Sequence, residues 1–331
     1  MPFYKGDLLN HFKKIQFALA NIGGAGRMDA RTFALEVGVG QKARILYPQF
    51  ITSDNGVRRY TSTFGPATKR FLGWCPYQSR CWEMASEKLT FKAFAMRNEI
   101  RTPSYSTNPG ETIACVVVKN NISSPASTIK GPLRSSLEYR LNNAAGEYYE
   151  RFVPGMITKI WYWTRLPVCL EFEKMPSVIG DDVATVGRLV ERRGRGTRQK
   201  LKIDSLIPFL RYQGITPDSV LAKGQELLVD FRYGSPLLDR DLMRNVDLIE
   251  DTIPALARQI SDIGDKLWRG IPQEVRSDAV FTVDAVIDAE ERVWALEMNS
   301  SPFMHPYVYP VMLNGLFAAK KDGIEEAMLQ I

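Results

Sequence analysis

The chain has 331 residues, of which 45% are hydrophobic and 24% are charged, with a formal net charge of +6 and a pI near 9.0. These proportions fit a globular protein with two or three lobes, and they exclude a low-complexity tail or a coiled coil. The N-terminal stretch has lysines at positions 5, 13 and 14 but no long apolar core, so it predicts neither a secretion signal nor a membrane span. A cytoplasmic location is therefore expected.

Cysteine and histidine content limits the available chemistry. The four cysteines lack the paired spacing of a zinc site, and we interpret them as ordinary thiols in a reducing compartment: Cys75, Cys81, Cys115 and Cys169. Only His11 and His305 are present, which leaves almost nothing for a histidine-based triad or a multi-histidine metal site. The chemistry is expected to depend on carboxylates, lysines and arginines.

Much of the positive charge lies in the run "ERRGRGTRQKLK" at residues 191–202. A basic run with glycines is typical of a solvated loop at the end of a helix, and contact with an anionic substrate or phosphate is the alternative. The basic balance of the whole chain permits nucleic acid, a membrane surface or an anionic small molecule as partner. The sequence leaves the role of this run open.

In chain order, residues 1–85 mix short apolar runs with glycine-rich and aromatic-rich connections, which predicts a small α/β lobe. Residues 86–103, "SEKLTFKAFAMRNEIRTP", predict a helix that Ser86 can cap and that Thr102-Pro103 bounds. The run "TIACVVVKNN" at 112–121 is typical of a buried strand, and "ISSPASTIKGP" is typical of a loop.

The second half also alternates strands and helices. "EYYERFV" at 147–153 predicts a strand, and "TKIWYWTRLPVCLEFEKMPSV" predicts two antiparallel strands around a turn at Leu166-Pro167. Helical periodicity returns in "DDVATVGRLVERR" and in "NVDLIEDTIPALARQISDIGDKLWRGI", which Pro254 interrupts. The segment "AVFTVDAVIDAEERVWALEMN" predicts two strands around a turn at residues 288–291.

This last hairpin places polar side chains on one face. In a regular hairpin, Asp284 faces Ala295, and Glu297 and Asn299 share that face. Asp284 and Glu297 are then diagonal neighbours, roughly 7 to 8 Å apart at the backbone. Two carboxylates and an amide oxygen suit Mg²⁺ that keeps waters and bridges substrate phosphates.

The alternative reading of the hairpin is an exposed polar edge. The apolar residues around the three polar ones indicate instead that it is buried, where unpaired carboxylates are costly and a metal removes the cost. The sequence shows no neighbouring cation on that face, although Arg276 or Arg292 is available from outside.

A site of this kind needs cations for a polyphosphate. Lys119 ends the apolar strand beside a Ser/Gly loop and is positioned to reach a phosphate, although lysines at strand ends usually only extend toward solvent. The loop offers hydroxyls, backbone N–H groups and Lys130 as a flap over phosphates. It lacks the spacing of a P-loop, so by itself it is a weak signal.

Taken together, these motifs resemble the ATP-grasp superfamily of carboxylate–amine ligases in their residues and their order. The matching segments are "SEKLTFK", "VVVKNN", "SSPASTIKG", "YYERFVPG", Asp284 and "LEMNSSP". The last is similar to D-alanine–D-alanine ligases, and the stretch from "MPSVIGDDVATVGRLV" onward is similar to an insert of cyanophycin synthetases. The resemblance covers about residues 80–315.

The resemblance implies an α/β (α+β) ATP-grasp fold, in which two α/β subdomains clamp ATP after a small N-terminal lobe. The implied bounds are 1–85 for the N-terminal lobe, 86–153 for the small subdomain with the flap, and 154–331 for the large subdomain with the magnesium site. It implies ATP with Mg²⁺, or alternatively Mn²⁺, as cofactors, and a carboxylate that is phosphorylated and then attacked by an amine to form an amide.

Roles follow from the resemblance residue by residue. The implied metal ligands are Asp284, Glu297 and Asn299. The implied nucleotide contacts are Lys88 and Lys119 on the phosphates, Ser127, Thr128 and Gly131 in the flap, Glu150, Arg151, Phe152 and Val153 at the adenine edge, and Leu296 under the ring. Lys130 and Arg232 are the candidate catalytic residues.

Three departures from the family pattern affect details. The flap has a single glycine, Gly131, so its contacts are expected from its serines and Thr128. Thr282 stands where many relatives have an arginine, and Arg232 in "VDFRYGS" is the candidate replacement for holding an acyl phosphate, with a surface arginine as the alternative. Ile157 stands where an acidic ribose contact is often found.

Competing functions stay open at this stage. The leading one is a ligase acting on an amino acid, a peptide or another small acid. The alternatives are an ATP-grasp phosphotransferase or kinase, and a nucleic-acid-associated modifying enzyme, which is possible but not favoured. No membrane association is expected, and a homo-oligomer is possible.

Overall fold

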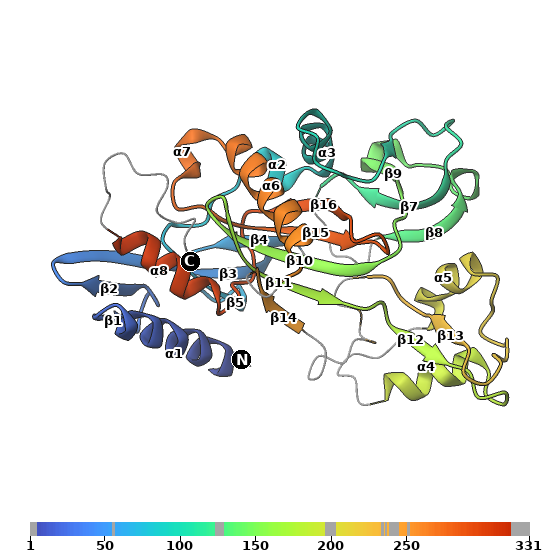
Figure 1. Cartoon of the computed structure of the whole chain (residues 1–331), viewed down its shortest axis with the longest axis horizontal. Helices are drawn as coiled ribbons and strands as arrows, with labels where there is room; N and C mark the ends of the chain where they lie inside the picture. Colours follow the sequence, from blue (N-terminus) through green and yellow to red (C-terminus); the bar gives the residue numbers. More distant parts are fainter. Residues whose placement is uncertain are drawn as a thin grey trace. The chain divides into compact units, whose positions relative to one another are not determined.

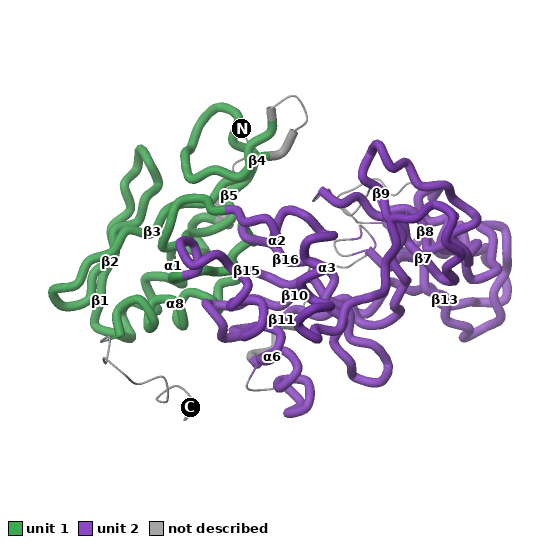
Figure 2. Tube along the Cα trace, turned by 90° about the horizontal axis from the view of Figure 1, so that it is seen from above, with its two compact units in different colours: residues 1–80, 277–280, 301–331 green, residues 81–276, 281–300 purple. Residues whose placement is uncertain are grey.

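The structure is a computed structural model that describes residues 5–54, 57–122, 129–195, 203–232, 235, 237, 245–249 and 252–318. The chain divides into two compact units, coloured separately in Figure 2. Unit 1 comprises Met1–Arg80, Ser277–Val280 and Ser301–Ile331, and unit 2 comprises Cys81–Arg276 and Phe281–Ser300. The three-part division expected from the sequence remains a prediction.

In the part that the structure describes, unit 1 combines two helices with an antiparallel sheet. The sheet has the order β1-β2-β3-β4, and β5 also pairs with β3. The bounds are α1 Lys5–Asn21, β1 Gly24–Met28, β2 Leu35–Val39, β3 Lys42–Asp54, β4 Val57–Thr61, β5 Thr68–Cys75 and α8 Val308–Phe317.

The core of unit 1 joins segments that lie far apart in the chain. Ile15 and Leu19 of α1 are fully buried, because their spacing of four residues places them on one face of the helix. His11 on the same helix is bonded through Nδ1 to the Tyr309 hydroxyl of α8 at 2.7 Å. Burial lowers the pKa of His11 to about 4, so this histidine is neutral and structural.

In its described residues, unit 2 contains three sheets and most of the helices (Figure 1). A four-stranded antiparallel sheet has the order β6-β9-β7-β8, with β6 Tyr105–Ser106, β7 Ala114–Asn120, β8 Lys130–Ser135 and β9 Glu147–Arg151. A five-stranded sheet has the order β14-β11-β10-β15-β16, with β10 Met156–Trp163, β11 Leu166–Glu173, β14 Asn245–Leu248, β15 Val280–Ile287 and β16 Val293–Asn299. A two-stranded sheet pairs β12 Ser177–Ile179 with β13 Glu226–Leu228.

The helices of unit 2 cover these sheets. Their bounds are α2 Glu83–Ser86, α3 Lys88–Arg97, α4 Val186–Gly194, α5 Ile207–Tyr212, α6 Pro254–Gly270 and α7 Gln273–Arg276, with short 3₁₀ turns at Ser136–Glu138, Asn143–Ala145 and Ile203–Ser205. Helices α2 and α3 pack along β16, and α6 packs on β11. The Tyr162 hydroxyl of β10 donates to the Ile260 carbonyl of α6 at 3.0 Å, which fixes that helix on the sheet.

The mixed α/β class predicted from the sequence is confirmed, as are the strands at 112–121 and 147–153 and the closing hairpin. Three local predictions were wrong. Residues 245–248 were expected in a helix but form the strand β14, which pairs with β11. The turn between β10 and β11 lies at residues 164–165 rather than at Leu166-Pro167, because Thr164 adopts the left-handed conformation (φ 53°) and Pro167 already pairs with Tyr162. Pro254 begins α6 instead of interrupting a helix, since the first helical turn needs no N–H donor there.

Within the described residues, no helix combines the length and the apolar character that a membrane crossing requires.

The turn of the closing hairpin is organised by one carboxylate. Asp288 accepts hydrogen bonds from the Glu290 and Arg292 N–H groups, from Arg292 Nε at 2.7 Å and from Trp294 Nε1 at 2.7 Å. Burial alone would raise the pKa of Asp288, but the bonds from Trp294 and Arg292 lower it to about 2.

This shift predicts how the hairpin responds to acid. Because the folded pKa lies below the ordinary value of 3.8, the unfolded chain binds more protons between these values, and stability present above pH ~4 is lost as the pH falls through about 2. We expect Asp288→Asn to lower the free energy of unfolding by about 1 kcal/mol at neutral pH, because solvent screens part of the effect. Urea unfolding should show this difference shrinking toward pH ~2, and a difference that is constant with pH would contradict it.

Candidate active site

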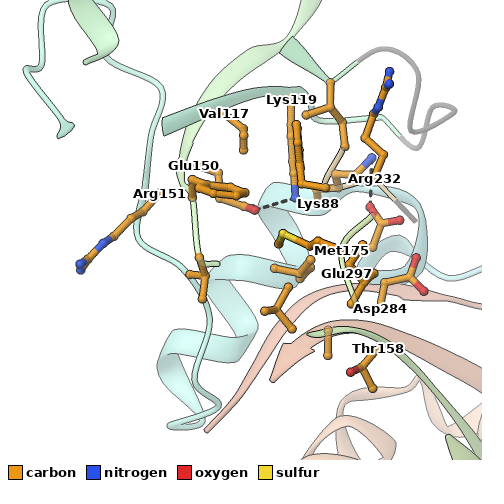
Figure 3. A pocket seen from close by; sticks show the side chains of 18 of the residues that line it. Lys88, Val117, Lys119, Glu150, Arg151, Thr158, Met175, Arg232, Asp284 and Glu297 are labelled. Atoms are coloured by element: carbon orange, nitrogen blue, oxygen red, sulfur yellow. Dashed lines mark hydrogen bonds and ion pairs between the residues drawn. The ribbon is translucent and has the colours of Figure 1, made fainter. Parts of the chain in front are cut away.

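A pocket open to solvent lies within unit 2 and holds about 930 Å³ of empty volume, part of it continuous with the exterior. Its lining combines apolar side chains, such as Val117, Met175 and Val286, with charged ones (Figure 3). Ten residues that the sequence singled out line it together: Lys88, Lys119, Glu150, Arg151, Phe152, Val153, Arg232, Asp284, Leu296 and Glu297. Segments separated by up to two hundred residues therefore meet at one cavity.

The acidic hairpin is irregular at the pocket. Asp284 pairs directly with Glu297 rather than with Ala295, for two reasons. The turn is one residue longer than expected, since Ile287 pairs with Val293, and the register shifts by one more residue between Asp284 and Ala285. Ala285 is then the partner of Ala295, so Leu296 is the extra residue of a β-bulge. The diagonal arrangement expected from a regular hairpin was wrong. The bulge breaks the alternation of side chains, which explains how Leu296 and Glu297, although consecutive, both line the pocket.

Two lysines neutralise this acidic pair. Lys88 Nζ lies 3.2 Å from Glu297 Oε2, and Lys159 Nζ of β10 forms an ion pair with Asp284. The expectation that no neighbouring cation serves this face was wrong, because Lys159 comes from the adjacent strand of the sheet. Arg292 instead binds Asp288 and Glu290, and Arg276 donates to backbone carbonyls at 269 and 271.

The oxygen atoms of the hairpin suit a hard divalent cation. Asn299 Nδ2 donates to Asp284 Oδ2 at 3.4 Å, so the amide lies beside the carboxylates although it does not line the pocket. Burial raises the pKa of Glu297 above its ordinary value, and the nearby Asp284 adds to this rise, whereas the charge of Lys88 opposes it. Within the described residues no group of three or more His, Cys, Asp and Glu gathers, so a bound Mg²⁺ would complete its shell with water or phosphate oxygens.

A second charged cluster lies between β7, β9 and α3. Lys119 Nζ is 2.6 Å from Glu150 Oε1, and Lys92 Nζ is 2.7 Å from Glu150 Oε2. Burial opposes the charge of Glu150, but Lys119 and Lys92 outweigh it and hold the pKa of that carboxyl below its ordinary value. Desolvation lowers the pKa of Lys92 to about 8, against the attraction of Glu150. Glu150 and Lys92 are therefore both charged at neutral pH.

Helix α3 holds Lys88 in place through its N-terminus. The expected cap, Ser86, lies in α2 and donates its hydroxyl to the Trp82 carbonyl. The free N–H groups of α3 are bound instead by Asn121, whose backbone oxygen accepts from Lys88 at 2.9 Å and whose Oδ1 accepts from Leu89 at 2.8 Å. Because Asn121 follows β7 directly, the same segment positions Lys88 and Lys119.

The segment after β9 forms an apolar wall with a free donor. The Phe152 N–H donates to the Cys115 carbonyl at 2.7 Å, and its ring packs edge-on against Phe209, Tyr212 and Phe231. Within the described residues, no acceptor is hydrogen-bonded to the Val153 N–H. The Arg151 side chain points away from the other labelled side chains in Figure 3, so its backbone faces the cavity.

Arg232 is fixed by a neighbouring carboxylate. Its Nε and one terminal nitrogen donate to the two oxygens of Asp230 at 2.8 and 3.0 Å, a bidentate pair. Asp230 is buried and also accepts from the Ser235 hydroxyl at 2.6 Å. Arg232 therefore lines the pocket in a fixed orientation, with part of its guanidinium fork left for an anion.

The phosphate flap is described only at its end. Ser127 and Thr128, with the earlier flap serines, lie outside the described residues. Lys130 is not brought to the pocket, because its ammonium is paired with Glu147 at 2.7 Å and bonded to the Tyr139 hydroxyl. Gly131 has φ 103°, a conformation that glycine adopts readily, and it lies outside the lining as well.

Sequence reasoning missed several residues of the site. Lys92 follows Lys88 by one helical turn, so its position on the same face of α3 was a readable signal. Lys159 had no local signal, because its role depends on which strand neighbours β15. Met175 and Phe231 add apolar lining from segments whose approach only the tertiary structure shows.

Comparison with known proteins gives matches among solved structures only. No protein-family model matches the chain, and no curated protein does. A bifunctional glutathione synthetase from Pasteurella multocida matches with a TM-score of 0.42 and 14% identity over 93% of this chain and 43% of that one. A D-alanine–D-alanine ligase from Bacillus anthracis matches with a TM-score of 0.38 and 11% identity, over 70% of this chain and 62% of that one.

The chain spans less than half of the glutathione synthetase. At TM-scores of 0.42 and 0.38, the likeness carries no argument about what this chain does. The function is therefore inferred from the site.

Proposed function

We propose that the chain is an ATP-dependent carboxylate–amine ligase of the ATP-grasp type. The observation that carries the proposal is that an apolar wall, Lys88, Lys119 and the pair Asp284 and Glu297 line the same pocket. An apolar slot beside converging cations and carboxylates fits a nucleotide whose base is buried and whose phosphates are held by charge.

The base and the phosphates would contact different parts of the lining. The faces of a purine would contact the apolar side chains of Val117, Ile157, Met175, Val286 and Leu296. The Val153 N–H is a donor for a ring nitrogen. Lys88 and Lys119 supply positive charge for phosphate oxygens. If the ammonium group of Lys88 moves from Glu297 to a phosphate oxygen, it still has an anionic partner.

Asp284, Glu297 and Asn299 would hold Mg²⁺ or Mn²⁺, which supplies neutralisation of phosphate charge. The chain's own residues have three tasks in this reaction. Lys88 and Lys119 bind the transferring phosphoryl group, Arg232 binds the acyl phosphate, and the apolar lining excludes water that would hydrolyse it. These tasks need no histidine.

The proposed reaction transfers the γ-phosphoryl group of ATP to a substrate carboxylate and releases ADP. The lone pair of the amine then attacks the acyl carbon, the C–O bond to phosphate breaks, and phosphate leaves with those electrons. The amine loses a proton, and an amide results. The substrates are expected to be an amino acid, a peptide or another small acid; the cytoplasmic location and a homo-oligomer remain predictions.

A screen of carboxylate and amine pairs for ADP release, read by product mass, tests the proposal. We expect ADP release to require both a carboxylate and an amine, with a product lighter than their sum by one water. ADP released with a hydroxyl acceptor alone, together with a stable phosphate ester, would overturn the ligase in favour of a phosphotransferase.

A further inference from the structure

Lys92 is a buried lysine next to the pocket but not part of its lining. Its side chain has no exposed surface, whereas Lys119 lines the cavity. The two lysines share one carboxylate, since Glu150 Oε1 accepts from Lys119 and Glu150 Oε2 binds Lys92. Lys92 also donates to the Thr102 hydroxyl at 2.8 Å. The cluster therefore has a definite geometry with one ion pair to each oxygen.

Charge balance gives this geometry a consequence for the pocket. Two lysines and one carboxylate sum to one net positive charge, and Lys119 is the member of the cluster with an ammonium group at the cavity. Without Lys92, the charge of Glu150 would cancel that of Lys119 at a contact of 2.6 Å. An anion in the pocket would then meet a neutral pair instead of a cation.

We propose that Lys92 is a positioning residue that neutralises Glu150 from inside the fold, so that Lys119 presents a net positive charge to a polyphosphate. The inference rests on the proposed function, because it concerns the phosphate end of the same site. Burial of a charged lysine costs free energy, since desolvation disfavours its charged form. The attraction of Glu150 offsets part of this cost. Its protonated form still prevails at neutral pH, because its pKa is about 8.

Three variants separate this role from simple packing. Lys92→Met keeps the apolar length and removes the charge; the double variant Lys92→Met with Glu150→Gln restores the net charge by removing one cation and one anion. Arg97→Met removes a charge from the exposed end of the same helix as a control. Binding of inorganic tripolyphosphate and of ATP is measured by calorimetry at neutral pH, and folding is checked by circular dichroism.

We expect Lys92→Met to weaken tripolyphosphate and ATP binding about tenfold, because one net charge is lost close to the anion. The double variant should bind tripolyphosphate, which has no base, within about twofold of the wild type, and Arg97→Met should be unchanged. A structural role would instead leave the double variant as weak as the single one, because the lost packing is not replaced. That result, or unchanged binding by a folded Lys92→Met, would overturn the inference.

The design also keeps the inference separate from the proposed function. If the wild type binds tripolyphosphate but not ATP, and Lys92→Met weakens the former, the charge role stands and the nucleotide proposal fails. If Lys92→Met does not fold because Glu150 Oε2 loses its partner, the double variant still decides. Wild-type affinity for tripolyphosphate in the double variant supports the role of Lys92, and affinity about tenfold weaker contradicts it.

Discussion

Glu297→Gln is expected to reduce ATP turnover about a thousandfold while leaving the fold intact. Glu297 lies opposite Asp284 at the bulge of the hairpin, so the substitution removes one of two carboxylates that would hold Mg²⁺ against the phosphates. Because the amide has nearly the shape of the carboxylate, the fold should survive, although Lys88 loses the charge of its partner at 3.2 Å and some stability is lost.

Two measurements check this prediction. ADP release with a carboxylate and amine pair found by the screen gives turnover, and urea unfolding gives the stability. Glu290→Gln is the matched control, because this exposed glutamate lies in the turn of the same hairpin and pairs with Arg292. Retention of wild-type turnover by Glu297→Gln would overturn the assignment of the metal site to this hairpin.

Lys119→Met is expected to raise the Kd for ATP by about tenfold to a hundredfold, the typical contribution of a hydrogen bond to a charged group. Lys119 is the lysine of β7 that lines the pocket, at the end of an apolar strand that fixes its backbone. The folded state should survive, since Glu150 keeps its ion pair with Lys92 at 2.7 Å.

Calorimetric titration with ATP and thermal unfolding separate these two effects. Lys266→Met is the control, because Lys266 lies on α6 and pairs with Asp262 on the surface of that helix. A folded Lys119→Met protein with the wild-type Kd would show that the phosphates lie elsewhere. The comparison with Lys92→Met is informative too, since removal of either lysine leaves Glu150 with one partner.

Local sequence patterns predicted most of the elements and most of the candidate residues. Apolar runs such as "ACVVVK" and the alternation around Asp284 predict strands wherever they occur, because these patterns depend only on local periodicity. The order of the motifs along the chain then indicated which residues belong to one site. These motifs are Lys88, Lys119 at the end of a strand, the acidic strand with Glu150, and the Glu-x-Asn motif of Glu297 and Asn299. The roles of those residues remain predictions.

Only the tertiary structure decided how the charges are paired. The direct pairing of Asp284 with Glu297 follows from a bulge at Leu296 and from a turn one residue longer than expected, and one-residue irregularities of this kind leave no clear mark in the sequence. The ion pair between Lys159 and Asp284 depends on strand order, and that between Lys92 and Glu150 depends on how α3 packs against β9. Local spacing fixes which side chains of one element share a face. Long-range packing decides which charged side chain of another element lies opposite them. This ion-pair partner sets the net charge of the site.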